Sequence, residues 1–251
     1  MAEIPRSYID GFTRAINLVS ESSRAGLLAA LESIDMSQDV ATVRDQVIAA
    51  MQVWCGGATD QAAVLAAAFY DGLREFELGA RMGAVANSGR VPEATDGAVR
   101  AFAQKLVDGR ADEFVALCLE RLDYETKVAA NETVLINGHR DSRKPRYARV
   151  PDGAETCDFC LMLASRGFVY QSEAAASHAH AGCDCRTVPS WKSHGVEGYD
   201  PSAIFDRWQD AIDAKAKERA ERNGTTEADE RKKILATYER SASNAKKRNR
   251  R

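Results

Sequence analysis

Two kinds of metal-binding side chain are concentrated in one short part of this 251-residue chain. Four of its six cysteines and two of its four histidines fall between positions 157 and 185: Cys157, Cys160, His178, His180, Cys183 and Cys185. A Cys-x-x-Cys turn directs two thiolates at one point, and a second close pair can complete a tetrahedral site. The spacing therefore predicts a structural zinc ion.

The second half of this pattern leaves the ligand set open. Two thiolates separated by one residue share a metal only where the chain turns tightly, so the predicted ligands are Cys157, Cys160, Cys185 and either Cys183 or His180. Zinc binding to such a segment supplies roughly 10–16 kcal/mol of apparent free energy. That contribution would offset the small apolar core that a module of this size can bury.

Other kinds of chemistry at these residues fit the pattern less well than structural zinc. The thiols could pack in a core or form a disulfide, and a redox Cys-x-x-Cys requires a βαβ context that the chain lacks. Zinc deaminases place His-x-Glu before the cysteine pair, whereas here the pair comes first and no glutamate follows His178-Ala179. A metal-dependent nuclease built from His178, His180 and Glu173 is the alternative function.

Residues 1–138 are predicted to form an acidic helical domain. Apolar residues recur at helical spacing, as in Val43, Val47 and Met51, and a long helix is expected near 111–137. Helix breaks are predicted at Gly56-Gly57, at Asn87-Ser88-Gly89 and at Gly109. Cys55 and Cys118 occupy apolar helical positions and are expected to be buried thiols.

Residues 139–199 are predicted to form a small α+β module. Its start is basic, with five cations within ten residues: Arg140, Arg143, Lys144, Arg146 and Arg149. Strands are expected at 147–150 and 185–189, a β-prone segment at 168–170, and a short helix at 158–166 closed by Gly167. His139 and His194 have polar neighbours and are expected at the surface.

Residues 200–251 are predicted to form a helical, basic extension. Pro201 suits a first helical turn, and Asn223-Gly224 breaks the run. The end of the chain carries the candidate DNA-binding residues Lys246, Lys247, Arg248, Arg250 and Arg251. Such a tail is either a solvated end or a contact for DNA phosphates.

Together these three segments predict a fold class that is mainly α, with a small α+β module of the Cys/His, zinc type.

Composition excludes several classes of protein. Apolar residues make up 45% and charged residues 28%, and the longest apolar stretch, Ala62–Tyr70, is too short to span a membrane. The start of the chain does not resemble a signal peptide, which predicts synthesis in the cytoplasm.

The net charge of −3 is unevenly distributed. Residues 1–135 carry 12 basic and 20 acidic side chains, whereas residues 206–251 carry 14 basic and 9 acidic side chains.

The arrangement over residues 140–191 resembles the phage Mu F-like family of minor head proteins. The resemblance rests on the Cys-x-x-Cys, on Gly167-Phe168-Val169-Tyr170, on the turn from His180 to Cys185 and on the Arg-Thr-Val-Pro segment that follows. Ala181 replaces a proline found in many members, and His178 is an additional histidine. The resemblance implies a non-enzymatic structural protein of the phage head.

The same resemblance implies partners and a location. The expected partners are the portal protein, the major capsid protein or both. The charge of the basic tail adds packaged double-stranded DNA as an expected contact, and the composition predicts no membrane. The expected location is the virion, in the capsid interior or at the portal vertex, and the host cytoplasm during assembly.

Overall fold

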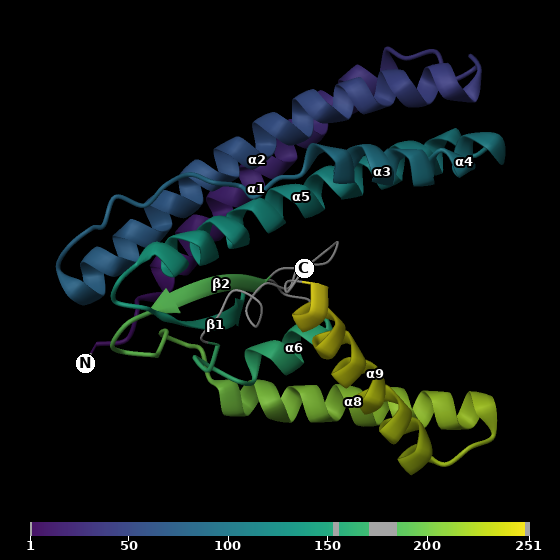
Figure 1. Cartoon of the computed structure of the whole chain (residues 1–251). Coiled ribbons are helices and arrows are strands. Elements are labelled where there is room, and N and C mark those ends of the chain that lie inside the picture. The colour runs from purple at the N-terminus through teal and green to yellow at the C-terminus, as the bar shows by residue number, and fades with distance from the viewer. Residues whose placement is uncertain (1, 153–155, 171–184, 249–251) are drawn as a thin grey trace.

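The computed structural model describes residues 2–152, 156–170 and 185–248, with side chains described as far as Arg240. Its elements are α1 (Arg6–Glu32), α2 (Val40–Leu78), α3 (Pro92–Phe102), α4 (Gln104–Val107), α5 (Ala111–Arg140), β1 (Arg146–Pro151), α6 (Asp158–Ala164), β2 (Cys185–Ser190), α8 (Pro201–Asn223) and α9 (Glu227–Arg248). Figure 1 shows α1, α2 and α5 as a long bundle, with the β1–β2 sheet between the bundle and the layer formed by α6, α8 and α9. The prediction of a mainly helical chain with a small β element is confirmed, while a zinc-type module is not shown.

The bundle forms because each long helix has one apolar face. Ile9 and Ile16 of α1, Val47 and Leu73 of α2, and Val134 of α5 are all fully buried. The long helix expected near 111–137 is α5, and the predicted break at Gly109 is confirmed by its left-handed φ of 71° between α4 and α5.

The predicted break at Gly56-Gly57 is wrong, because α2 runs through both glycines as one helix of 39 residues. A glycine inside a helix costs about 1 kcal/mol relative to alanine. The buried neighbours Cys55, Ala58 and Ala62 pack on the same helix face and outweigh that cost. Helix α2 instead ends at Gly79, whose φ is 78°.

The connection between α2 and α3 is held against α5 by a side-chain amide that hydrogen-bonds to both backbone groups of one residue, as a neighbouring β-strand would. Asn137 accepts a hydrogen bond from the Val85 amide at 2.8 Å and donates to the Val85 carbonyl at 2.9 Å. Thr133 donates to the carbonyl of Asn87 at 2.7 Å. The predicted break at Asn87–Gly89 is confirmed, and Pro92 begins α3.

The sheet consists of two antiparallel strands whose register runs from Arg146 opposite Ser190 to Pro151 opposite Cys185. Both strands were predicted. The third β-prone segment, 168–170, contributes a single bridge in which Tyr170 pairs with Tyr147. Helix α6 covers the predicted helical segment, and Gly167, with a φ of 65°, follows its end.

The apolar core beneath the sheet is shared between the bundle and the residues that follow it. Val134 of α5 belongs to the same buried cluster as Val150 of β1 and Val188 of β2. The backbone N–H of Thr187 in β2 donates to the Asn131 side chain of α5 at 3.0 Å. A second cluster, at the far end of the bundle, is built by residues 27–122. The domain boundary near 138 remains a prediction. Residues on both sides of this boundary belong to the same buried apolar cluster.

Two arginines of the sheet are fully buried. Arg149, the last of the five cations counted at the start of the predicted α+β module, is 0% exposed and donates to Thr187 Oγ1 at 2.8 Å. Arg186 is 1% exposed and donates to Thr13 Oγ1 at 3.0 Å and to Asn17 Oδ1 at 3.2 Å. Arg149 therefore faces the core and adds no charge to the protein surface, and Arg186 fastens β2 to α1.

The C-terminal helices form a hairpin that packs on α6. Asp200 caps α8 by accepting from the amides of Ser202 and Ala203, and Gly224, with a φ of 65°, ends the helix as predicted. Ile212 of α8 packs against Ile234 of α9. Helix α9 then continues to Arg248.

Candidate metal centre

The Cys157–Cys160 pair is positioned by the start of α6. Cys157 is the N-cap residue of this helix, and its Sγ accepts a hydrogen bond from the backbone N–H of Cys160 at 3.4 Å. A thiolate that accepts a backbone N–H at a helix start is stabilised by that hydrogen bond and by the positive end of the helix. Cys157 is exposed, whereas Cys160 is 2% exposed.

Cys185 joins Cys160 from the other half of the predicted site. It is the first residue of β2, it is 0% exposed, and it packs against Cys160 in a separate buried cluster of these two residues. The antiparallel pairing of β2 with β1 and the packing of α6 on the sheet bring the two thiols together across 24 intervening residues. The structure thus unites one residue from each predicted pair.

The remaining predicted ligands lie outside the described residues. These are His180 and Cys183, together with His178 and Glu173 of the nuclease alternative. Within the described ranges, no three cysteine, histidine or acidic side chains form a group that could hold a metal ion. The described part of the site is therefore a buried pair of thiols with Cys157 beside it.

Asp158, inside the Cys-x-x-Cys segment, is the point at which the C-terminal hairpin docks. Its Oδ2 accepts from Lys215 Nζ of α8 at 3.0 Å and from the Tyr238 hydroxyl of α9 at 3.2 Å. The Tyr238 ring also lies 6.0 Å from the Phe159 ring, centroid to centroid. Burial and the negative charge of Asp158 raise the pKa of Tyr238 to about 12. Sequence reasoning missed these contacts, because partners 57 and 80 positions apart leave no local pattern.

A second polar cluster holds the turn after β2. The Glu77 carboxylate of α2 accepts hydrogen bonds from the amides of Trp191, Lys192 and Ser193 and from the hydroxyls of Ser190 and Ser193. Burial alone raises the pKa of Glu77, but the hydrogen bonds from Ser193 and from the Trp191 amide outweigh burial, so that this pKa lies below its ordinary value. Glu77 is thus an ionised anchor for the 190–193 turn.

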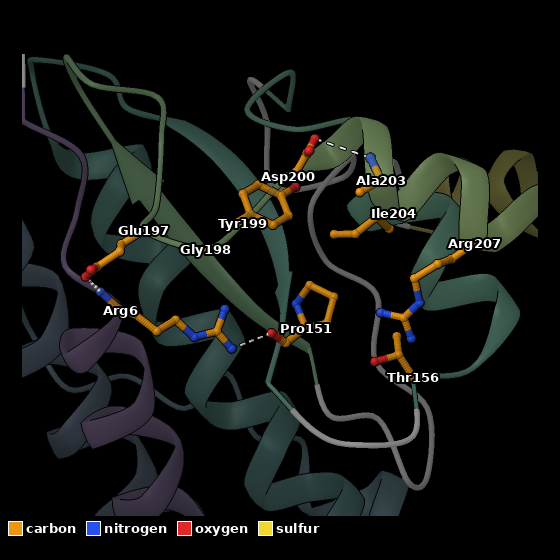
Figure 2. Close-up of a pocket in the computed structure, with 10 residues that line it drawn as sticks. All are labelled: Arg6, Pro151, Thr156, Glu197, Gly198, Tyr199, Asp200, Ala203, Ile204 and Arg207. Atoms are coloured by element: carbon orange, nitrogen blue, oxygen red, sulfur yellow. Dashed lines mark hydrogen bonds between the residues drawn. The ribbon is translucent and has the colours of Figure 1, made fainter.

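A pocket of about 390 Å³ opens beside Thr156, next to the Cys-x-x-Cys segment. Figure 2 shows Arg207 of α8 directed towards Thr156, and Arg6 on the opposite side beside Pro151 and Glu197. Arg6 donates to the Pro151 carbonyl at 2.8 Å. Two cations, Arg6 and Arg207, and two carboxylates, Glu197 and Asp200, line the wall, so the lining selects no single ligand charge.

The other cysteines and histidines lie where the sequence placed them. Cys55 and Cys118 are fully buried, and burial raises the pKa of both thiols, that of Cys118 to about 12. His139 and His194 are exposed. The tail residues Lys246, Lys247 and Arg248 belong to α9, but their side chains lie outside the described part, as do Arg250 and Arg251.

Comparisons with known proteins give one match. A search of curated proteins and a search of solved structures both find nothing similar. No helix in the described ranges has the length and apolar character needed to cross a membrane. The family model described as VG15 protein matches residues 3–211, which include the bundle, the sheet, α6 and the first part of α8. The chain therefore belongs to the VG15 protein family, a family of viral or phage gene products.

Proposed function

We propose that this protein is a structural minor capsid protein of a tailed phage, associated with the portal vertex and active in head assembly. The observation that carries the proposal is the family match, because one phage family model spans the bundle and the cysteine-bearing module together. The sequence resemblance to Mu F-like minor head proteins supports the finer role.

The bundle offers a surface on which a portal or coat protein can dock. Leu18 of α1 is 65% exposed, and Val53 and Val64 of α2 are 71% and 59% exposed. Burial of apolar side chains against a partner is favourable by about 25 cal/mol per Å². The acidic excess of residues 1–135 adds long-range attraction towards a basic partner surface.

In this proposal the cysteine segment holds one structural zinc ion. Cys160 and Cys185 supply a buried thiol pair, Cys157 is the third ligand, and either Cys183 or His180 is the fourth. A donor set of three or four thiolates suits tetrahedral zinc. Because the three described thiols do not form a metal-holding group, zinc has to draw the exposed Cys157 thiolate towards the buried pair. The bound ion would then link α6 to β2.

The basic tail is proposed to contact packaged DNA. Lys246, Lys247, Arg248, Arg250 and Arg251 form a run without an acidic residue. Binding through such a run comes from counterion release and ignores base sequence. A solvated tail without a ligand is the alternative, and truncation at residue 240 distinguishes the two.

Head assembly with and without the gene tests the main proposal. We expect the full-length protein to co-purify with the portal protein or with proheads, in few copies, and heads made without it to be defective in assembly or DNA delivery. A Leu18→Asp, Val53→Asp variant should lose this association, whereas Val169→Asp, at an exposed position after α6, should keep it. Absence from proheads, or plasmid cleavage that a His178→Ala, His180→Ala variant abolishes, would favour the nuclease instead.

A further inference from the structure

Five exposed cations surround the corner where α5 leads into β1. Arg140 ends α5, Arg143 and Lys144 lie in the turn that follows, and Arg146 begins β1. Lys192 lies in the turn after β2. We name this set the basic corner: Arg140, Arg143, Lys144, Arg146 and Lys192. All five side chains belong to exposed residues.

Long-range contacts bring Lys192 to the other four cations. The strand register places Arg146 opposite Ser190, two positions before Lys192. The indole N–H of Trp191 donates to Oδ2 of Asp141 at 3.2 Å, and Asp141 lies between Arg140 and Arg143 in the chain. Two turns that are about fifty residues apart in sequence therefore present their charges on one surface.

The carboxylates at this corner are directed inwards. The Asp141 side chain is 1% exposed and accepts from Tyr70, from Arg74 at 2.8 Å and from the Arg143 amide at 2.8 Å. Glu77 is occupied by the amides and hydroxyls of the 190–193 turn. Within the described residues, no cation of the basic corner is within ion-pair distance of a carboxylate. The corner therefore presents unneutralised positive charge.

The corner also has a defined shape. The Lys144 amide donates to the Asp141 carbonyl, and Lys144 adopts a left-handed backbone with a φ of 43°. The ammonium of Lys144 donates to the His139 carbonyl at 2.7 Å, which leaves donors for another group. Pro145 is buried directly after it. The cations are thus presented by a structured turn joined to a helix and a strand.

The chemistry of the corner favours phosphate in a hydrophilic polymer. Guanidinium groups bind phosphate through paired hydrogen bonds, and duplex DNA offers closely spaced phosphates along a groove edge. A membrane surface would call for exposed apolar or aromatic anchors. Neither the 139–146 segment nor Lys192 supplies one, and the Trp191 indole is hydrogen-bonded inwards.

We propose that the basic corner is a duplex-DNA contact that binds the phosphate backbone without regard to base sequence, and that it acts separately from the C-terminal tail. The proposal stands on the exposed charges and their geometry and does not depend on the assignment to the phage head. The basic corner forms only when the α5–β1 turn and the turn after β2 meet.

Anisotropy titration of a short labelled duplex with the full-length protein at several salt concentrations tests this. In the variant Arg140→Gln, Arg143→Gln, Arg146→Gln we expect affinity to fall by on the order of ten-fold or more at low salt, with a log–log salt slope shallower by about 2 to 3. The matched control Arg100→Gln, Arg110→Gln, Arg222→Gln removes three exposed arginines that each pair with a carboxylate, and should leave both quantities unchanged.

Two outcomes would overturn the proposal. Equal losses in the corner variant and the control would show a general charge effect and overturn it. An unchanged salt slope in the corner variant, together with binding that disappears when residues 240–251 are removed, would assign the contact to the tail. The corner variant should still melt at the parent temperature and co-purify with the portal protein, so that failure of the DNA contact and failure of the head assignment are read separately.

Discussion

The side-chain oxygen of Asn131 accepts the backbone N–H of Thr187 at 3.0 Å, which ties the middle of α5 to the middle of β2. Both residues are buried. A strand at the edge of a two-stranded sheet has backbone groups that need partners. The helical bundle supplies this one through a side chain, so the sheet is fastened to the bundle by polar contacts as well as by the shared apolar core.

Removal of this acceptor should destabilise the protein. In Asn131→Leu the Thr187 amide stays buried without its partner, and we expect the free energy of unfolding to fall by about 1–3 kcal/mol. Denaturant unfolding measures the loss. The control Gln61→Ala, at an exposed position of α2, should change stability by less than about 0.5 kcal/mol. Equal stability of Asn131→Leu and the parent would mean that the contact contributes nothing.

Metal content should follow the cysteines of the α6–β2 site. Elemental analysis of the purified full chain should give about one zinc per molecule, and Cys160→Ser and Cys185→Ser should each lose it. Cys118→Ser, a buried cysteine far from this site, should keep its zinc. A chain that contains no metal, and whose melting temperature a chelator leaves unchanged, would contradict the zinc proposal.

Two glycine substitutions should have opposite effects. A Cβ at Gly138 would overlap the buried Tyr147 side chain, so Gly138→Ala forces the Tyr147 ring to shift and should cost at least about 1–3 kcal/mol. Gly57→Ala meets no atom within 4 Å in the middle of α2 and should stabilise by up to about 1 kcal/mol. Thermal melting of the pair checks the close approach of the strand to α5.

Acid should weaken the anchor of the 190–193 turn. The pKa of Glu77 is below its ordinary value in the folded state, so its ionised form stabilises the fold above the unfolded pKa of about 4.3, and this contribution is lost as pH falls through the folded pKa. Glu77→Gln should therefore show a shallower loss of stability below about pH 4 than the parent. Glu120→Gln, exposed on α5, serves as control and should keep the parent slope.

The contact between Tyr238 of α9 and Asp158 can be tested by titrating the Tyr238 hydroxyl at alkaline pH. In the folded protein Tyr238 should ionise near its pKa of about 12, above the ordinary value of 10, and the ultraviolet difference between the parent and Tyr238→Phe reports this step. Stability from this group is present below about pH 10 and lost as pH rises towards the folded value. A difference titration centred near 10 would mean that α9 does not dock as described.

The sequence by itself predicted the helices that have a strong apolar period, the two strands and most of their ends. Gly109, Gly167 and Gly224 each adopt a left-handed backbone where a stop was predicted, because glycine reaches that conformation without steric cost. The burial of Cys55 and Cys118 followed from their positions on apolar helix faces. These are local properties, which depend on neighbours within a few positions in the chain.

Tertiary structure alone decided which polar residues became partners. Gly56 and Gly57 remain helical because α2 is packed along its length, and Arg149 is buried because β1 directs it into the core. The carboxylates of Glu77 and Asp141 reach turns 113 and 50 positions away, and in the part of the chain that the structure describes neither forms an ion pair with a cation of the basic corner. A local sequence pattern predicts which face of a helix or strand is buried. It does not predict which distant residue contacts that face, because this depends on how the helices and the sheet pack together.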